Sequence, residues 1–275
     1  MTESSKLPVR NNDNPQQISA ADAEKHYLEK GTVNPLSYRY QDLDVLIYST
    51  GKTGGTTLAN SFRKRGMTVG HLHYNFPGFD RVEAIVKEPR KHKLLMLTAY
   101  REPVAQCLSM FFQNTNILLK ITDDELLQKD VEWLKEQVNI YALELSGGIM
   151  VPQPFVANSL QDFDGTNIFT KPFNREEGFT KLETDRVQIL VLRFDKISNW
   201  QRIIRTQTAY TDFVLVPENI TAAKKIGELY KRVRDSIVIP KLVLDRFYQQ
   251  EAANMAHLYT PSEIADIKNI WYKRL

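Results

Sequence analysis

Residues 44–58 read Asp-Val-Leu-Ile-Tyr-Ser-Thr-Gly-Lys-Thr-Gly-Gly-Thr-Thr-Leu. The run 45–48 is apolar, as expected of a strand that is covered on both faces, and residues 56–65 favour a helix. A strand, a glycine-rich loop and a helix in this order direct backbone N–H groups and a helix N-terminus at one point, where an anion is stabilised. This stretch therefore predicts a phosphate-binding loop at the end of a buried strand.

The loop also carries side chains suited to an anion. Gly54 and Gly55 let the main chain approach a phosphate closely, and the hydroxyls of Thr56 and Thr57 are hydrogen-bond donors. Lys52 supplies a cation.

The position of the lysine helps to decide between kinds of phosphate chemistry. The nucleoside-triphosphate P-loop follows G-x-x-x-x-G-K-[ST], and Gly51-Lys52-Thr53 fits the end of that pattern. Its first glycine, however, falls at Leu46, and the other glycines of this loop come after the lysine. A degenerate NTPase loop and a non-catalytic glycine-rich turn both stay open on this motif alone.

Composition places the chain among ordinary globular proteins. With 275 residues, 42% of them hydrophobic and 25% charged, we expect one large core and a single domain over 19–275 after a flexible tail over 1–18. A formal net charge of +3 is too small to indicate a nucleic-acid partner. Cys107 is the one cysteine, no run of apolar residues is long enough for a transmembrane segment, and the N-terminus lacks a signal peptide, so a cytoplasmic protein is expected.

Strands and helices alternate after residue 44, which predicts an α/β fold with a mostly parallel central sheet flanked by helices. The expected elements are the strands 44–49, 67–73, 93–99 and 187–194 and the helices 56–65, 80–88 and 103–113. Further helices are expected at 19–31 and 123–146 and over the C-terminal third, at 221–238, at 240–257 and from Thr260 onward. The segment 150–185 reads as a long loop region, and 213–216 as a short strand or extended segment.

A second motif follows the strand 93–99. Arg101 stands at the carboxyl end of that strand, and Ser109 lies two turns into the next helix, where both can converge on one anion. Ligands of parallel α/β sheets bind at this end of the strands. In the competing interpretation, Arg101 pairs with a nearby carboxylate and Ser109 is only a small helix residue.

Together the two motifs resemble those of the PAPS-dependent sulfotransferase superfamily, where PAPS is 3′-phosphoadenosine 5′-phosphosulfate. The first loop of that family follows K-x-G-x-T-x-L, which is matched by Lys52, Gly54, Thr56 and Leu58. Leu58 directly follows Thr57 where cytosolic sulfotransferases have Trp-Leu, so the likeness is to the carbohydrate, heparan-type branch. The C-terminal residues 244–248 and 257–264, together with Trp271, are similar to the end of bacterial capsular-polysaccharide-synthesis proteins of the sulfotransferase type.

The second family motif is an arginine at a strand end, often in R-[DN]-P, with a serine eight residues later. Arg101, Pro103 and Ser109 match it, whereas Glu102 replaces the usual Asp or Asn. By resemblance, the chain is expected to have the P-loop-like sulfotransferase fold and to bind PAPS, with the 3′-phosphate held by Arg101 and Ser109. The residues expected to hold the 5′-phosphosulfate are Lys52, Thr53, Gly54, Gly55, Thr56 and Thr57.

Sulfuryl transfer needs a base for the acceptor's proton and a cation for the leaving phosphate. Lys52 is the expected cation. The strand 67–73 ends in Gly-His-Leu-His, so alternation places His71 and His73 on one face at the carboxyl end. His73 is expected to be the general base, with His71 as a helper that orients the acceptor. A structural histidine and a metal site are the alternatives, but a metal needs a third ligand and none has a suggestive spacing.

The sequence thus predicts an enzyme that transfers a sulfuryl group from PAPS to a hydroxyl of a carbohydrate or polysaccharide acceptor, without a metal. Two alternatives remain. One is a P-loop kinase or NTPase, which needs an acidic residue at a second strand end, for which Asp195 is the best available. The other is a nucleotide-binding relative that has lost catalysis.

Overall fold

The computed structural model describes residues 42–73, 89–90, 92–147, 170–217 and 225–273. All of them belong to one of the two units into which the chain divides, the unit Pro35–Leu275. The expected tail 1–18 and the expected helices 19–31 and 80–88 lie outside the described residues.

The described core is a five-stranded sheet in which four neighbouring strands are parallel. The order across the sheet is β2-β1-β3-β5-β4, and β4 is antiparallel to β5. The bounds are Val45–Ser49 for β1, Val69–His73 for β2, Leu94–Tyr100 for β3, Phe179–Glu183 for β4 and Val187–Arg193 for β5. The α/β class and the mostly parallel sheet are therefore confirmed.

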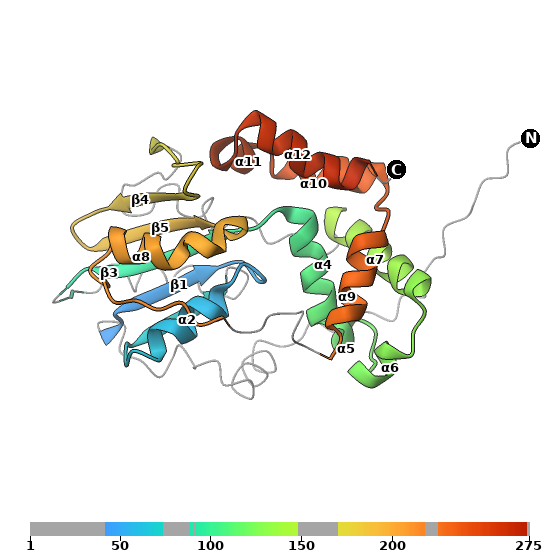
Figure 1. Ribbon diagram of the computed structural model, residues 1–275, viewed down its shortest axis with the longest axis horizontal. Coiled ribbons are helices and arrows are strands. Elements are labelled where there is room, and N and C mark those ends of the chain that lie inside the picture. Colours follow the sequence, from blue (N-terminus) through green and yellow to red (C-terminus); the bar gives the residue numbers. More distant parts are fainter. Residues whose placement is uncertain (1–41, 74–88, 91, 148–169, 218–224, 274–275) are drawn as a thin grey trace, which may run out of the picture. The chain divides into compact units, whose positions relative to one another are not determined.

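Helices cover both faces of the sheet, because successive strand residues point to opposite sides. On one face Val45 and Ile47 pack with α2 (Gly55–Arg63) and α8 (Trp200–Gln207) in one apolar cluster. On the other face Leu46 and Tyr48 join a larger cluster. It includes residues of the helices α4 (Pro103–Gln113), α7 (Val131–Ser146), α9 (Gly227–Ser236), α10 (Lys241–Gln250), α11 (Ala252–Leu258) and α12 (Pro261–Tyr272). Figure 1 shows α2 and α8 lying side by side over the strands.

Two elements match the sequence closely because their ends are marked by local chemistry. The helix α4 spans 103–113 as expected, and α12 begins at Pro261 after a capping box formed by Thr260 and Glu263. The helical character of the C-terminal third is confirmed for the described residues, although the expected helix 240–257 is two helices, since α10 ends at Gln250 and α11 starts at Ala252.

The single helix expected over 123–146 is wrong. The structure has α6 (Asp123–Leu127) and then α7, which starts anew because the side chain of Asp130 accepts a hydrogen bond from the backbone N–H of Glu132 at 3.1 Å. A further short helix, α5 (Thr115–Leu118), precedes them. A side chain that caps a new helix breaks the chain direction even where the apolar spacing continues.

The end of the expected loop region 150–185 is also wrong, since Phe179–Glu183 forms β4. This edge strand alternates between buried and more exposed positions, as expected for a short strand that is covered on one side. Residues 213–216 lie outside the strands of the described sheet. A 3-10 helix, η4 (Phe194–Asn199), leads from β5 into α8.

Candidate functional site

The glycine-rich loop joins β1 to α2 at the carboxyl end of the sheet. Lys52 has a φ of 66° and Gly54 a φ of 87°, so two residues of the loop are left-handed. The hydroxyl of Thr53 donates to the carbonyl of Thr50 at 2.8 Å, and the backbone N–H of Leu58 donates to the carbonyl of Gly54 at 3.1 Å. Alternating backbone conformations of this kind turn successive N–H groups toward one concave side, which suits an anion.

Both loop glycines are also required by their neighbours. A Cβ at Gly54 would lie 2.8 Å from the indole of Trp200, and one at Gly55 would lie 2.6 Å from Ser49 Oγ and 2.7 Å from His71 Nε2. The first helical turn of α2 is therefore pressed against β1 and β2. This close packing fixes where the N-terminus of α2 points.

Arg101 brings the second motif to the loop. Its Nη1 donates to the carbonyl of Lys52 at 3.1 Å, and its guanidinium lies over the ring of Phe194, 4.5 Å from the centroid. Burial lowers the pKa of Arg101 below its ordinary value, while Tyr230 and Glu102 act in the opposite direction. Among the described residues Arg101 forms no ion pair with a carboxylate. The competing interpretation, an arginine kept for a carboxylate, therefore finds no support in these contacts.

Glu102 stands next to Arg101 but serves α4 instead. Its two carboxylate oxygens accept the backbone N–H groups of Val104 at 2.9 Å and Ala105 at 2.6 Å, and the hydroxyl of Tyr248 donates to it at 3.0 Å. Burial raises the pKa of Glu102, and these hydrogen bonds lower it in part. The residue that departs from the family motif is thus the N-cap of the helix that carries Ser109.

Gln106, in the first turns of α4, contacts the loop, and this contact was not predicted from the sequence. Its Nε2 donates to the carbonyl of Gly51 at 2.7 Å and to Oγ1 of Thr50 at 3.1 Å. The sequence did hold a signal: the residue falls five positions after Arg101, on the helix that begins where β3 ends. The aromatic contacts of Phe194 and Trp200 were missed because these two residues come from a segment that is distant in the sequence.

Ser109 and the threonines of α2 differ in their exposure. Ser109 is buried within α4, with 4% of its surface exposed, and no hydrogen bond within the described part of the chain joins it to the loop. Thr53 and Thr57 are buried, whereas Thr56 is partly exposed. The hydroxyl of Thr53 thus shapes the loop by its hydrogen bond to the carbonyl of Thr50.

The two histidines lie on β2, beside the loop strand. His71 pairs with Ile47 in the parallel register, so its side chain points to the α2 face, and His73 pairs with Ser49. Both ring nitrogens of His71 are enclosed by protein. His73 is the last residue of the strand.

Asp195, the acid that a kinase interpretation needs, is already engaged. Its Oδ1 accepts from Nε of Arg193 at 3.1 Å and its Oδ2 accepts from Nη2 at 2.6 Å. The hydroxyl of Tyr259 also donates to this carboxylate, at 3.3 Å. The pair is one part of a larger contact around Arg193, which also binds Glu263 at 2.9 Å.

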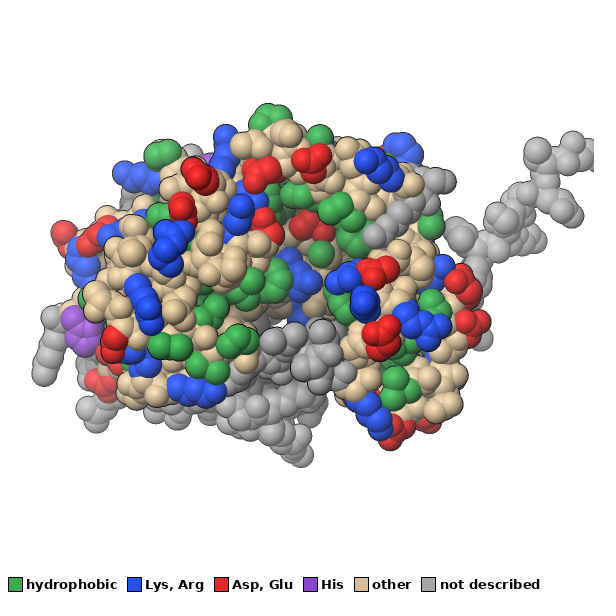
Figure 2. Space-filling view, viewed as in Figure 1, with side chains coloured by type: hydrophobic (Ala, Val, Ile, Leu, Met, Phe, Trp, Pro, Cys, Tyr) green, Lys and Arg blue, Asp and Glu red, His purple; other side chains and the backbone are tan. Residues whose placement is uncertain are grey.

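The visible face of the described residues carries charged side chains of both signs. Figure 2 shows Lys and Arg side chains inside a hollow in the middle of the face, with hydrophobic side chains beside them. Within the described ranges no group of three or more His, Cys, Asp and Glu side chains is arranged to hold a metal ion. None of the described helices combines the length and the apolar character that crossing a membrane requires.

Comparison of the chain with protein-family models, with curated proteins and with solved structures finds no match.

Proposed function

We propose that this chain is a PAPS-dependent sulfotransferase that transfers a sulfuryl group to a hydroxyl of a carbohydrate-type acceptor. The observation that carries the proposal is the contact between its two motifs, in which Arg101 donates to the carbonyl of Lys52 at 3.1 Å. A guanidinium that has no carboxylate partner among the described residues, next to a loop with left-handed residues at Lys52 and Gly54, suits a ligand with two separate anionic groups. PAPS has this character, with a 5′-phosphosulfate and a 3′-phosphate.

Different residues of the two motifs bind the two anionic groups of the nucleotide. The backbone of Thr53, Gly54 and Gly55 and the hydroxyls of Thr56 and Thr57 hold the 5′-phosphosulfate at the start of α2. Arg101 and Ser109 hold the 3′-phosphate. The hydroxyl of Ser109 has no partner among the described residues, so binding a phosphate breaks no existing hydrogen bond of this side chain.

The chemical step needs two further roles. His73 takes the proton of the acceptor hydroxyl while the new bond between the acceptor oxygen and sulfur forms. At the same time the bond between sulfur and the bridging phosphate oxygen breaks, and Lys52 neutralises the charge that develops on that oxygen. Because both nitrogens of His71 are enclosed, His71 supports β2 and the start of α2 and does not meet the acceptor directly.

The kinase or NTPase alternative is weaker because its candidate acid, Asp195, is already bound to another side chain. Both carboxylate oxygens of Asp195 bind Arg193, so this acid is not available to hold Mg²⁺ unless that contact breaks. ATP binding that depends on Mg²⁺ and exceeds the binding of adenosine 3′,5′-bisphosphate would favour this alternative.

Calorimetry with adenosine 3′,5′-bisphosphate tests the proposal most directly. The protein is expected to bind this product nucleotide. The absence of binding at millimolar nucleotide concentration would contradict the proposal. Arg101→Ala is expected to weaken binding by about a hundredfold, since a charge-assisted hydrogen bond is worth about 1.5–3 kcal/mol. Arg202, an exposed arginine of α8, provides the control, since Arg202→Ala should leave binding unchanged.

A transfer assay with radiolabelled PAPS and a panel of glycans separates the enzyme from a relative without catalysis. His73→Ala should lose at least about a hundredfold in rate while it retains nucleotide binding. Full activity in His73→Ala would move the base to another residue. Nucleotide binding without transfer to any glycan would favour the non-catalytic alternative.

A further inference from the structure

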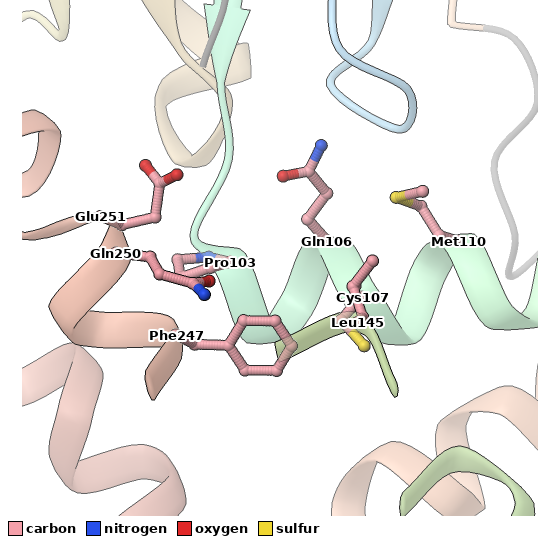
Figure 3. A pocket seen from close by; sticks show the side chains of 8 residues that line it. All are labelled: Pro103, Gln106, Cys107, Met110, Leu145, Phe247, Gln250 and Glu251. Carbon is pink, nitrogen blue, oxygen red and sulfur yellow. The ribbon is translucent and has the colours of Figure 1, made fainter. Parts of the chain in front are cut away.

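We infer that Gln106 is a positioning residue that sets the direction of the backbone N–H groups in the phosphate loop. The inference rests on the proposed function. It starts from the pair of hydrogen bonds that Gln106 donates across the gap between α4 and the loop, 2.7 Å to the carbonyl of Gly51 and 3.1 Å to Thr50 Oγ1. In Figure 3 the side chain of Gln106 extends from α4 toward the loop that follows β1.

The loop needs such a contact because its conformation is costly. Lys52 is a non-glycine residue at a φ of 66°, a region that costs about 1–3 kcal/mol and persists only where the surroundings enforce it. Three side chains act on consecutive residues here. Thr53 binds the carbonyl of Thr50, Gln106 binds that of Gly51 and Arg101 binds that of Lys52.

The consequence for an anion follows from the planarity of the peptide group. In a trans peptide the C=O of one residue and the N–H of the next point in opposite directions. When Gln106 holds the carbonyl of Gly51, the N–H of Lys52 is therefore turned away from α4. Arg101 does the same for the N–H of Thr53 by holding the carbonyl of Lys52. The two residues together orient two neighbouring donors toward the other side of the loop.

Gln106 is not itself placed to bind a large ligand. It lines a pocket with Pro103, Cys107 and Glu251, shown in Figure 3, whose volume of about 30 Å³ suits one or two water molecules. The amide therefore acts on the nucleotide through the loop, and its loss should weaken anion binding without removing any direct contact.

The test compares Gln106→Met with Gln188→Met. Both glutamines are half-buried, and each donates a 2.7 Å hydrogen bond to a backbone carbonyl, but Gln188, near the start of β5, donates to Gln207 at the end of α8. The probes are inorganic pyrophosphate and adenosine 3′,5′-bisphosphate in calorimetry, with urea unfolding of each variant. Gln106→Met should raise the Kd of both probes about tenfold, as expected for two lost hydrogen bonds, and Gln188→Met should not.

In the transfer assay Gln106→Met should raise KM for PAPS about tenfold and change kcat less than about threefold, because the lost contact serves binding. A Kd for pyrophosphate equal to that of the wild type would overturn the inference and leave the proposed function standing. Pyrophosphate binding that Gln106→Met weakens, without any nucleotide binding, would support the inference and defeat the proposed function. If Gln106→Met does not fold, Gln106→Asn gives the same test, since its amide is one methylene short of the loop.

Discussion

Gly54 is constrained in two independent ways, by its backbone conformation and by its neighbours. Its φ is 87°, and an added Cβ would lie 2.8 Å and 2.9 Å from two ring atoms of Trp200, which is fully buried. A buried indole cannot move aside at low cost, since protein interiors are close-packed. We expect Gly54→Ala to lower the free energy of unfolding by about 3 kcal/mol, from backbone strain and overpacking together. Urea unfolding measures this change.

Gly66 offers a matched control at the end of the turn between α2 and β2. Its φ is 76°, but an added Cβ would have no neighbour within 4 Å. Gly66→Ala should therefore cost about 1 kcal/mol, from backbone strain alone. Equal losses of unfolding free energy in Gly54→Ala and Gly66→Ala would show that the packing against Trp200 adds nothing to the cost of an alanine at position 54. Gly54→Ala should also lose anion binding, whereas Gly66→Ala should retain it.

At the scale of single residues, the sequence was informative where chemistry depends on local spacing. Lys52, the two loop glycines and Arg101 could be placed because a strand end and a following helix are visible in the chain itself. Gln106 and Phe194 were not identified, because Gln106 contacts a loop residue 55 positions away and Phe194 contacts an arginine at the end of a different strand. Their importance comes from tertiary packing, which no local pattern contains.

At the scale of elements, Glu251 lies at the break between α10 and α11. Its carboxylate accepts a hydrogen bond from Nδ2 of Asn254 at 2.9 Å, and burial raises its pKa above the ordinary value of 4.5. A carboxyl whose pKa is raised in the folded state holds its proton longer than in the unfolded chain. Its contribution to stability therefore falls as the pH rises from 4.5 through the raised pKa, and it is level above that value.

Glu251→Gln should remove this part of the pH dependence. The variant is expected to lose less stability than the wild type when the pH is raised above 4.5. Urea unfolding at a series of pH values measures the difference. Part of the slope should remain, because the pKa of Glu102 is raised as well. Identical slopes in the two proteins would show that Glu251 titrates alike in the folded and unfolded states.

The same scale shows why some elements were predicted and others were not. The parallel strands β1, β3 and β5 are continuous apolar runs, which a sequence displays directly. The break at Asp130 and the strand β4 depend on a cap and on an edge pairing with β5, and both interrupt or override the apolar spacing. Helix and strand boundaries follow such local contacts more than they follow composition.

At the scale of the described fold, Arg193 links the sheet to the C-terminal helices. It is the last residue of β5, with 2% of its side chain exposed, and it binds Asp195 at 2.6 Å and Glu263 of α12 at 2.9 Å. It also donates to the carbonyl of Leu258 at 3.3 Å and lies 3.9 Å from the ring centroid of Tyr259. One buried side chain therefore connects β5 with α11 and α12.

Arg193→Met should destabilise the protein by about 3 kcal/mol, because it removes several charge-assisted hydrogen bonds at once. This loss of unfolding free energy should be smaller than the largest losses seen when a buried ion pair is broken. Asp195 and Glu263 are 47% and 33% exposed, so water can solvate their carboxylates once the arginine is gone. Arg202→Ala, which breaks an exposed pair with Glu177, should cost about 0–1 kcal/mol. Urea unfolding gives both values, and hydrogen exchange should show faster exchange of the α12 amides in Arg193→Met alone. A change in Arg193→Met no larger than that in Arg202→Ala would show that apolar packing, without this arginine, holds the C-terminal helices on the sheet.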